Sequence, residues 1–148
     1  MLRIRVICTG KLKEKFYTDA CAEYVKRLQR YCRPEILELP ESGNLPEEGK
    51  TVLANIPEGS YVVAMCVEGE ERSSEELAKL LAKLALNGCS RVCFLLGSST
   101  GLAEDVKKKA DLRLSMSPMT FPHHLARVMV LEQIYRAFTI IEGSGYHK

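Results

Sequence analysis

Hydrophobic residues follow two different spacings along this chain, and segments of the two kinds alternate. Short segments that are apolar, or that alternate apolar with polar residues, predict β-strands over residues 2–8, 35–39, 61–67, 91–96 and 112–116. The segments 61–67 and 91–96 are almost wholly apolar, which is typical of central strands buried on both faces of a sheet.

Between these strands, apolar residues recur every three or four positions, as in amphipathic helices. Helices are predicted over residues 15–31, 46–56, 103–110 and 122–138, and another opens at Ser73 and runs through Leu84. Ser73 and Glu76 form a capping-box pattern at the start of that helix, and Asn87-Gly88 marks its end.

Two of the predicted helices carry an apolar stripe that is expected to face the core. The stripes consist of Phe16, Ala20, Tyr24 and Leu28 in the first helix and of Leu125, Val128, Leu131, Tyr135 and Phe138 in the last. Pro34 is expected to stop the first helix, and Pro122 to be the first residue of the last.

The alternation of strands and helices predicts an α/β fold with a mainly parallel sheet and helices on both faces. The chain has 148 residues, of which 46% are hydrophobic and 27% are charged. This is enough for one hydrophobic core and too little for two. Because no repeat or linker interrupts the pattern, residues 1–148 are expected to form a single domain.

The composition argues against membrane, secreted and metal-binding proteins. No apolar run reaches the roughly 18–20 residues of a membrane span, and the first residues do not resemble a signal peptide. The six cysteines form no Cys-x-x-Cys pair, and no histidine lies close in sequence to the nearest pair, Cys89 and Cys93. We expect a soluble, cytoplasmic protein with free cysteines and no metal.

Charge is distributed unevenly, although the net charge is only +2. Residues 1–33 carry nine Lys and Arg against three Asp and Glu, residues 34–76 two against eleven, and residues 77–148 ten against five. Two basic segments around an acidic one permit a face that binds a polyanion such as nucleic acid. Ordinary solvated surface charge accounts for the same counts.

Three loops follow the carboxyl ends of predicted strands, where parallel sheets bind their ligands. They span residues 65–70, 97–102 and 117–121. The second loop begins Gly97-Ser-Ser-Thr-Gly101, which lacks both the ending of a P-loop and the pattern of a dinucleotide fingerprint. A phosphate-cradling turn and an ordinary tight turn both fit this sequence.

Ionisable residues gather along the last predicted helix. His123 and His124 stand at its start, where one of them could cap the helix or act as a base near neutral pH. They point about 100° apart and are poorly placed to share a metal. Arg127, Glu132 and Arg136 follow, and ion pairing within the protein is their simplest interpretation.

The C-terminal tail has an unusual composition. After a flexible Gly-Ser-Gly it ends in Tyr146, His147 and Lys148. These side chains suit stacking on a nucleobase, proton transfer and contact with phosphate. A frayed end without a function is the commoner outcome for such a segment.

Residues 114–138 read LSMSPMTFPHHLARVMVLEQIYRAF, and the chain ends in Gly-Tyr-His-Lys. This block, the opening Gly10-Lys-Leu-Lys-Glu-Lys and the total length resemble the RlmH family of bacterial ribosomal RNA methyltransferases, within the SPOUT superfamily. The resemblance covers the whole chain, and its motifs are specific in combination.

The resemblance implies a deep trefoil knot near the C-terminus, an exception to the near-absence of knots in proteins. It implies that three loops bind S-adenosyl-L-methionine and that the protein is a homodimer whose final helices pack together. The implied reaction is methylation of N3 of a pseudouridine in a stem-loop of 23S rRNA, on the assembled ribosome.

Matched by position, the cofactor-binding residues of the family are Met65, Gly97, Met116, Ser117, Pro118, Met119, Thr120 and Phe121. Ser98 stands where the family has the second glycine of a Gly-Gly turn. If this position required a positive φ, serine would strain it by about 1 kcal/mol and weaken cofactor binding.

The resemblance also supplies candidates for the chemistry. His123 and His147, the latter from the partner's tail, are equal candidates for the base that removes the imide proton. Tyr146 would stack on the target base, and Arg127 and Lys148 would meet phosphate or the deprotonated pyrimidine. Four basic residues are candidate contacts to the rRNA backbone, namely Lys26, Arg27, Arg30 and Arg33.

Two alternatives from other classes are weighed against this function. A non-catalytic ribosome- or RNA-binding factor on the same fold would tolerate a changed cofactor loop, which Ser98 favours and the intact Thr120-Phe121-Pro122-His123 opposes. A SPOUT enzyme that acts on another base or on tRNA is the second alternative. It would be expected to carry a further RNA-binding domain, for which this chain is too short.

Overall fold

The computed structural model describes residues 1–148, and strands and helices alternate along the whole chain. The elements are β1 (Arg3–Thr9), α1 (Lys15–Leu28), β2 (Arg33–Leu39), α2 (Leu45–Ala54), β3 (Tyr61–Glu71), α3 (Ser74–Leu86), β4 (Arg91–Leu96), α4 (Glu104–Lys109), β5 (Leu112–Ser115) and α5 (His123–Ile141). All ten predicted elements are therefore present, with most of their boundaries within three residues.

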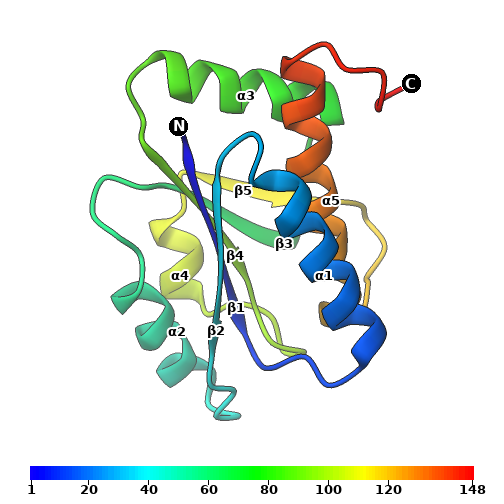
Figure 1. Ribbon diagram of the computed structural model, residues 1–148. Coiled ribbons are helices and arrows are strands. Elements are labelled where there is room, and N and C mark those ends of the chain that lie inside the picture. The colour runs from blue at the N-terminus through cyan, green and yellow to red at the C-terminus, as the bar shows by residue number, and fades with distance from the viewer.

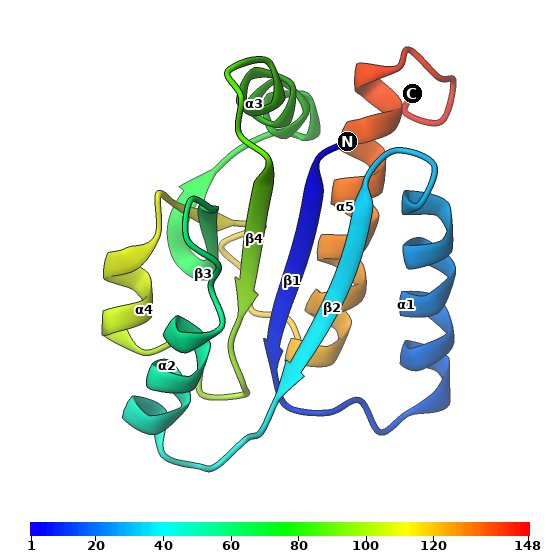
Figure 2. The same cartoon turned by 60° about the vertical axis from the view of Figure 1, so that its left-hand side comes forward.

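The strands form one sheet in the order β2-β1-β4-β3-β5 (Figure 1). Every neighbouring pair is parallel, which confirms the predicted α/β class. The carboxyl ends of β1, β2 and β4 lie together at the bottom of Figure 2, and both chain termini lie at the opposite end.

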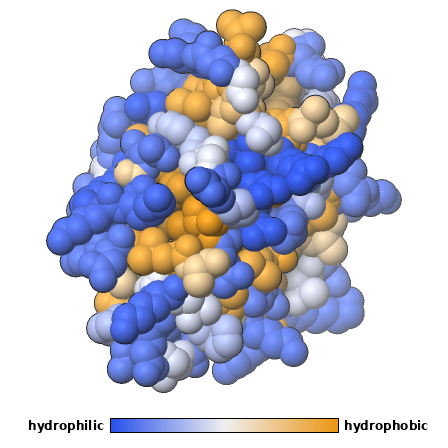
Figure 3. Space-filling model, turned by 90° about the vertical axis from the view of Figure 1, so that its left-hand side faces the viewer, coloured by the Kyte–Doolittle hydropathy of each residue, from blue (hydrophilic) through white to orange (hydrophobic).

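Helices cover both faces of the sheet, as predicted. Helices α1, α3 and α5 lie on one face, and the shorter α2 and α4 lie on the other (Figure 2). Side chains alternate along β1 accordingly, because Ile4 and Val6 join the larger core cluster while Ile7 joins the smaller one. Viewed from the side of α2 and α4, the surface is mostly hydrophilic, with hydrophobic residues showing near its middle (Figure 3).

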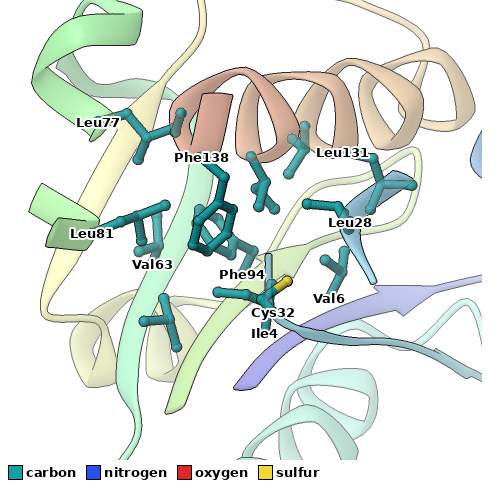
Figure 4. Packing of buried hydrophobic residues seen from close by; sticks show 14 of the residues in the cluster. Ile4, Val6, Leu28, Cys32, Val63, Leu77, Leu81, Phe94, Leu131 and Phe138 are labelled. Atoms are coloured by element: carbon teal, nitrogen blue, oxygen red, sulfur yellow. The ribbon is translucent and has the colours of Figure 1, made fainter. Parts of the chain in front are cut away.

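The larger cluster of 21 buried residues holds α5 against the centre of the sheet. Phe138 of α5 points down to Phe94 of β4, with Leu81 of α3 on one side, and Leu131 of α5 lies above Leu28 of α1 on the other (Figure 4). This packing fixes the direction of α5 and, with it, the position of the loop that precedes the helix.

Local capping signals in the sequence operate as predicted. The Ser73 hydroxyl accepts a hydrogen bond from the Glu76 N–H at 3.1 Å, and the Glu76 carboxylate accepts one from the Ser73 N–H at 2.8 Å. At the other end of α3, Gly88 takes a φ of +86° after the C-cap residue Asn87. The start and the end of this helix were therefore encoded locally.

Both proline predictions are wrong in detail. Helix α1 ends at Leu28, and Pro34 lies inside β2. Since β2 is an edge strand, a proline there can leave its missing N–H on the open side. Pro122 is the N-cap residue of α5 and not its first helical residue.

The predicted helix stripes are also partly wrong. Phe16 is 65% exposed, so the stripe of α1 reaches the core only toward its C-terminal end. In α5 the buried positions include Val130, Ile134 and Ala137, and of the predicted stripe only Leu131 and Phe138 are buried. Because α5 is apolar almost all round, its sequence does not specify which side faces the sheet.

Strand β3 extends four residues beyond its predicted end and changes register on the way. Met65 and Glu70 both pair with Leu114 of β5, and the residues between them bulge out. A Cβ on Gly69 would lie 2.8 Å from the backbone carbonyl of Arg113, so only glycine allows this close crossing of the two segments.

No helix in the structure is both long and apolar enough to span a membrane.

Candidate functional site

The three loops predicted to form a pocket line one cavity of about 700 Å³ at the carboxyl end of the sheet. A volume of this size is typical of a small-molecule site. The segment predicted as the first loop is instead the bulged part of β3, and it contributes Met65, Cys66, Val67 and Glu68. The second loop contributes Leu96 to Leu102, and the third, with the start of α5, contributes Thr120, Phe121, Pro122 and His123. Segments far apart in sequence therefore meet where a parallel sheet binds its ligands.

Seven of the eight candidate cofactor residues lie in or beside this cavity. Met65, Gly97, Thr120 and Phe121 line it directly. A smaller apolar cleft shares Met65, Thr120 and Phe121 with the cavity and adds Met116, Ser117 and Met119. Pro118 lines neither space. The side chain of Ser117 accepts a hydrogen bond from the Met119 N–H at 3.1 Å, which fixes the turn.

The turn after β4 is closed by its two glycines. A Cβ on Gly97 would stand 2.3 Å from the carbonyl carbon and oxygen of Gly101, so position 97 admits no side chain. Gly101 has a φ of +86° and donates its N–H to the carbonyl of Ser98 at 2.9 Å. This geometry therefore requires both glycines.

Ser98 does not carry the backbone strain that a positive φ at this position would have caused. No residue other than glycine has a positive φ in this protein, so serine at position 98 carries no left-handed backbone. Its hydroxyl lies 2.9 Å from the Thr100 hydroxyl and 3.3 Å from the carboxylate of Glu48. Ser98 thus contributes hydrogen bonds to the turn where the family motif has glycine.

Glu48 is a residue of this site that the sequence analysis missed. It is 5% exposed, and its carboxylate accepts hydrogen bonds from the N–H groups of Ser42 and Gly43 at 2.9 and 3.0 Å, besides the one from the Ser98 hydroxyl. No cation pairs with it. The carboxylate therefore ties the loop after β2 to the cofactor turn, 50 positions away in sequence. No local pattern distinguishes it from the exposed acids of α2.

His123 links this cavity to a second one of about 820 Å³. The second cavity carries Lys11, Lys13 and several acidic residues. Burial, together with the neighbouring His124, lowers the pKa of His123 below its usual 6.5. Its imidazole is therefore mostly neutral at pH 7 and able to accept a proton.

An ion pair stands on the cavity wall. The Lys107 ammonium lies 2.5 Å from the Glu68 carboxylate, and both residues line the cavity. The hydrogen bond between them raises the pKa of Lys107 and lowers that of Glu68. Apolar walls and one charge of each sign fit a ligand with an aromatic base and a zwitterionic end, such as S-adenosyl-L-methionine.

Arg127 does not reach the cavity, which corrects its expected role as a phosphate or pyrimidine contact. It is 2% exposed, its Nη1 pairs with the Glu38 carboxylate at 2.5 Å, and its Nη2 donates to the Gly10 carbonyl at 2.9 Å. Burial opposes the ionisation of Glu38, but the hydrogen bonds from Arg127 and from the Leu12 N–H, together with the positive charges of Arg127 and Lys11, outweigh it, and the pKa of Glu38 is lowered. Arg127 is a positioning residue that fastens α5 to β1 and β2.

The C-terminal tail is folded back onto α5 and α3. The Tyr146 hydroxyl donates a hydrogen bond to the Glu132 carboxylate at 2.8 Å. The Tyr146 ring centroid lies 4.9 Å from that of Tyr135, and the Arg136 guanidinium lies over the Tyr146 ring. Burial and the bond to Glu132 raise the pKa of Tyr146 to about 12. The tail is ordered by these contacts, so the frayed end expected as the commoner outcome is not found.

His147 is held between two charged partners. Its Nδ1 lies 3.0 Å from Nη1 of Arg136, and its Nε2 lies 2.7 Å from the Glu75 carboxylate. Because arginine can only donate, Nδ1 is the acceptor and Nε2 carries the hydrogen that goes to Glu75. Both ring nitrogens are thus engaged within the chain.

The two candidate bases lie far apart in one chain. His123 begins α5, whereas His147 is bound to Arg136, 13 residues or about 20 Å further along the helix. The structure therefore brings His123 to the cofactor cavity and leaves Tyr146 and His147 outside it.

The basic residues predicted to contact the rRNA backbone do not form one continuous surface of unpaired charges. Arg27 pairs with Glu23 at 2.8 Å and lies over Tyr24, and Arg30 lies over Tyr31. Arg33 belongs to β2 and not to α1. All six cysteines are free, and no group of three potential ligands is close enough to hold a metal.

Known proteins resemble this chain over its full length. The family model described as "Predicted SPOUT methyltransferase" matches residues 2–147. Ribosomal RNA large subunit methyltransferase H of Clostridioides difficile is 45% identical, over 99% of this chain and 100% of that protein. The protein of that name from Bacillus pumilus is 43% identical with the same coverage.

Solved structures support the fold. A probable methyltransferase from Bordetella pertussis matches with a TM-score of 0.57 at 15% identity, over 93% of this chain and 96% of that one. The tRNA (m1G37) methyltransferase of Aquifex aeolicus matches with a TM-score of 0.53 at 17% identity, over 91% of this chain and 69% of that one. The fold, the gathering of the three loops and the full-length identity agree, and the chain belongs to the SPOUT methyltransferase family, in its ribosomal RNA large subunit methyltransferase H group.

Proposed function

We propose that this protein transfers the methyl group of S-adenosyl-L-methionine to N3 of a pseudouridine in a stem-loop of 23S rRNA, in the cytoplasm and on the assembled ribosome. The observation that carries the proposal is the 45% identity to ribosomal RNA large subunit methyltransferase H over the whole of both chains. The cavity at the carboxyl end of the sheet supplies a site of fitting size and chemistry. Residues 1–148 act as one SPOUT domain.

The cofactor, when bound, supplies a methyl group already activated by its positive sulfur. The chain has to bind it, exclude water and hold the target nitrogen in line. Met65 and Phe121 enclose the adenine, with Met116, Ser117, Pro118, Met119 and Thr120 completing the adenine loop. The Gly97 turn lines the cavity closely because it carries no side chain at position 97, and the Glu68–Lys107 pair offers both charges to the amino-acid end.

His123 is the base that the geometry favours. It lines both the cofactor cavity and the second cavity, so a pyrimidine entering from the second would meet it. Its lowered pKa leaves the imidazole free of a proton at neutral pH, and no side-chain hydrogen bond engages it. In this role His123 accepts the N3 proton as the methyl group is transferred.

The tail acts in the partner subunit of a homodimer. Within one chain, Tyr146 and His147 are about 20 Å from His123, so a tail that serves catalysis has to reach a second cavity. Leu125 and Met129 of α5 are only half-buried and pack in neither core cluster, which leaves an apolar side of this helix for the final helix of a partner. Tyr146 would then stack on the target base, with Lys148 at a phosphate.

The close passage between β3 and β5 is where the proposed C-terminal knot has its crossing. Gly69 lets the extension of β3 pass directly over the backbone of Arg113 and Leu114. Residues 116–122 then lead into α5, which packs back across the sheet. A trefoil knot needs such a crossing, and it would hold the three cofactor loops together.

The test is methyl transfer from radiolabelled S-adenosyl-L-methionine to ribosomes from a strain without the corresponding enzyme. Isolated 23S rRNA and tRNA serve as parallel substrates. We expect label in ribosomes alone, at N3 of one pseudouridine. Label on tRNA or free rRNA would keep the fold and cofactor and change the substrate. No label anywhere, and no cofactor binding by calorimetry, would favour a non-catalytic RNA-binding factor.

A further inference from the structure

Four arginines surround a depression at the amino end of the sheet, opposite the cofactor cavity. The depression has a volume of about 210 Å³ and is lined by Arg3, Ile4, Arg5, Arg33, Pro34, Glu35 and Arg91. It lies on the edge half of the sheet formed by β2, β1 and β4, which Figure 2 shows side by side. One carboxylate faces four guanidinium groups there.

Three of these arginines form a straight row across three strands. Arg3 of β1 is in register with Arg33 of β2 on one side and with Arg91 of β4 on the other. Neighbouring strands lie about 4.8 Å apart, and parallel residues in register point to the same face. We call Arg33, Arg3 and Arg91 the arginine row.

The charges of the row are not neutralised within the protein. The one nearby acid, Glu35, pairs with Arg5 at 3.0 Å and is not available to the row. Arg5 also donates a hydrogen bond to the Asn55 carbonyl at 3.0 Å. Four other arginines pair with acids of the chain in the same way, namely Arg27, Arg72, Arg127 and Arg136. The members of the row make no ion pair and no side-chain hydrogen bond.

Such a row is costly for the fold by itself. Like charges on directly opposed positions of neighbouring strands destabilise a sheet, and nothing in the packing of β1, β2 or β4 requires arginine at these exposed or half-exposed positions. A bound polyanion removes this cost. The planar guanidinium group pairs with phosphate through two parallel hydrogen bonds, which lysine cannot do.

We propose that the arginine row binds successive backbone phosphates of the RNA substrate. The inference rests on the proposed function for the identity of that RNA. Strand β1 is seven residues long, so the row stands about 20 Å from the cofactor end of the sheet. The row is a docking contact remote from the methylated base, and it holds the RNA without reading its sequence.

The test compares the triple variant Arg3→Gln, Arg33→Gln, Arg91→Gln with a matched control, Lys50→Gln, Lys79→Gln, Lys83→Gln. Both remove three exposed or half-exposed positive charges, but the control lysines lie on α2 and α3. We expect the row variant to raise KM for ribosomes about tenfold and to reduce the slope of log affinity against log salt by about 2 to 3. Cofactor affinity and Tm stay unchanged, and the control behaves as wild type.

A third variant, with lysine at all three positions of the row, separates charge from geometry. It is expected to keep the salt slope and to recover only part of the affinity. The proposal is overturned if the row variant matches the lysine control in KM and in salt slope. It is also overturned if affinity falls with no change in slope, because the contact is then not to phosphates.

Failure of the proposed function is recognised separately. If wild type transfers no methyl group to ribosomes, binding of a single-stranded RNA of uniform sequence is measured across salt concentrations for wild type and both glutamine variants. A smaller slope for the row variant alone supports the row even then. Equal slopes for all three proteins overturn it.

Discussion

At the carboxyl end of the sheet, the cofactor cavity is bounded mainly by turns and apolar side chains, and His123 stands in it without a hydrogen-bond partner. The tail at the far end of α5 has the opposite character. There Tyr146 and His147 are fully engaged with Glu132, Arg136 and Glu75. The cavity thus has room and a histidine without a hydrogen-bond partner, whereas the polar groups of the tail are already paired within the chain.

This difference is the reason why the proposed reaction assigns the tail to a partner subunit. Groups suited to stacking and proton transfer lie about 20 Å from the cavity that needs them, along a rigid helix. In the homodimer proposed above, a partner subunit would supply the missing groups without any movement of that helix. The following predictions test this division, beginning with the largest expected effect.

Deletion of Tyr146–Lys148 is expected to reduce methyl transfer to ribosomes by about 100-fold or more while cofactor affinity stays unchanged, because the cavity contains no tail residue. Calorimetry gives the affinity, and label transfer gives the rate. Mixing the truncated chain with a Gly97→Val chain should restore activity, since a mixed dimer has one intact cavity and one tail. Full activity of the truncated protein would rule out any role of the tail.

Replacement of His123 by glutamine is expected to lower kcat about 100-fold if His123 is the base. Because its folded pKa lies below 6.5, wild-type activity should rise with pH through that lowered pKa and level off near neutrality. The variant should lose this rising limb. A limb that persists in His123→Gln would assign the base to another group, with His147 as the next candidate.

Gly97→Ala is expected to weaken cofactor binding at least tenfold, because the added Cβ would stand 2.3 Å from the Gly101 backbone and the turn would have to open. Gly145→Ala is the matched control, since its Cβ meets nothing within 4 Å and cofactor affinity should not change. Calorimetric titration distinguishes the two. Equal affinities would mean that the turn does not form the cofactor site.

Glu48→Gln and Ser98→Ala are expected to weaken cofactor binding only a few-fold each. The two changes remove one shared contact, so in a double-mutant cycle their effects should be less than additive by about 0.5 kcal/mol or more. Binding and thermal unfolding are measured for all four proteins. Strictly additive effects would show that Glu48 does not act on the cofactor turn through Ser98.

The secondary-structure elements and most of the cofactor cavity could be predicted from the sequence. Strand and helix periodicity, the Ser73–Glu76 box and the glycines of the cofactor turn are local features, so the chain itself specifies the elements and the loops after them. The ends of β-strands in a parallel sheet share one edge, and this rule alone brought Met65, Gly97 and Thr120 together.

The features that the sequence left undecided depend on pairs of distant residues. Glu48 resembles any surface acid until folding places it beside Ser98, and Arg127 resembles a surface cation until Glu38 and Gly10 enclose it. The arginine row exists only through the register of three strands. Periodicity reports which residues share a face of one element, whereas contacts between elements are decided by packing and register, which only the tertiary structure contains.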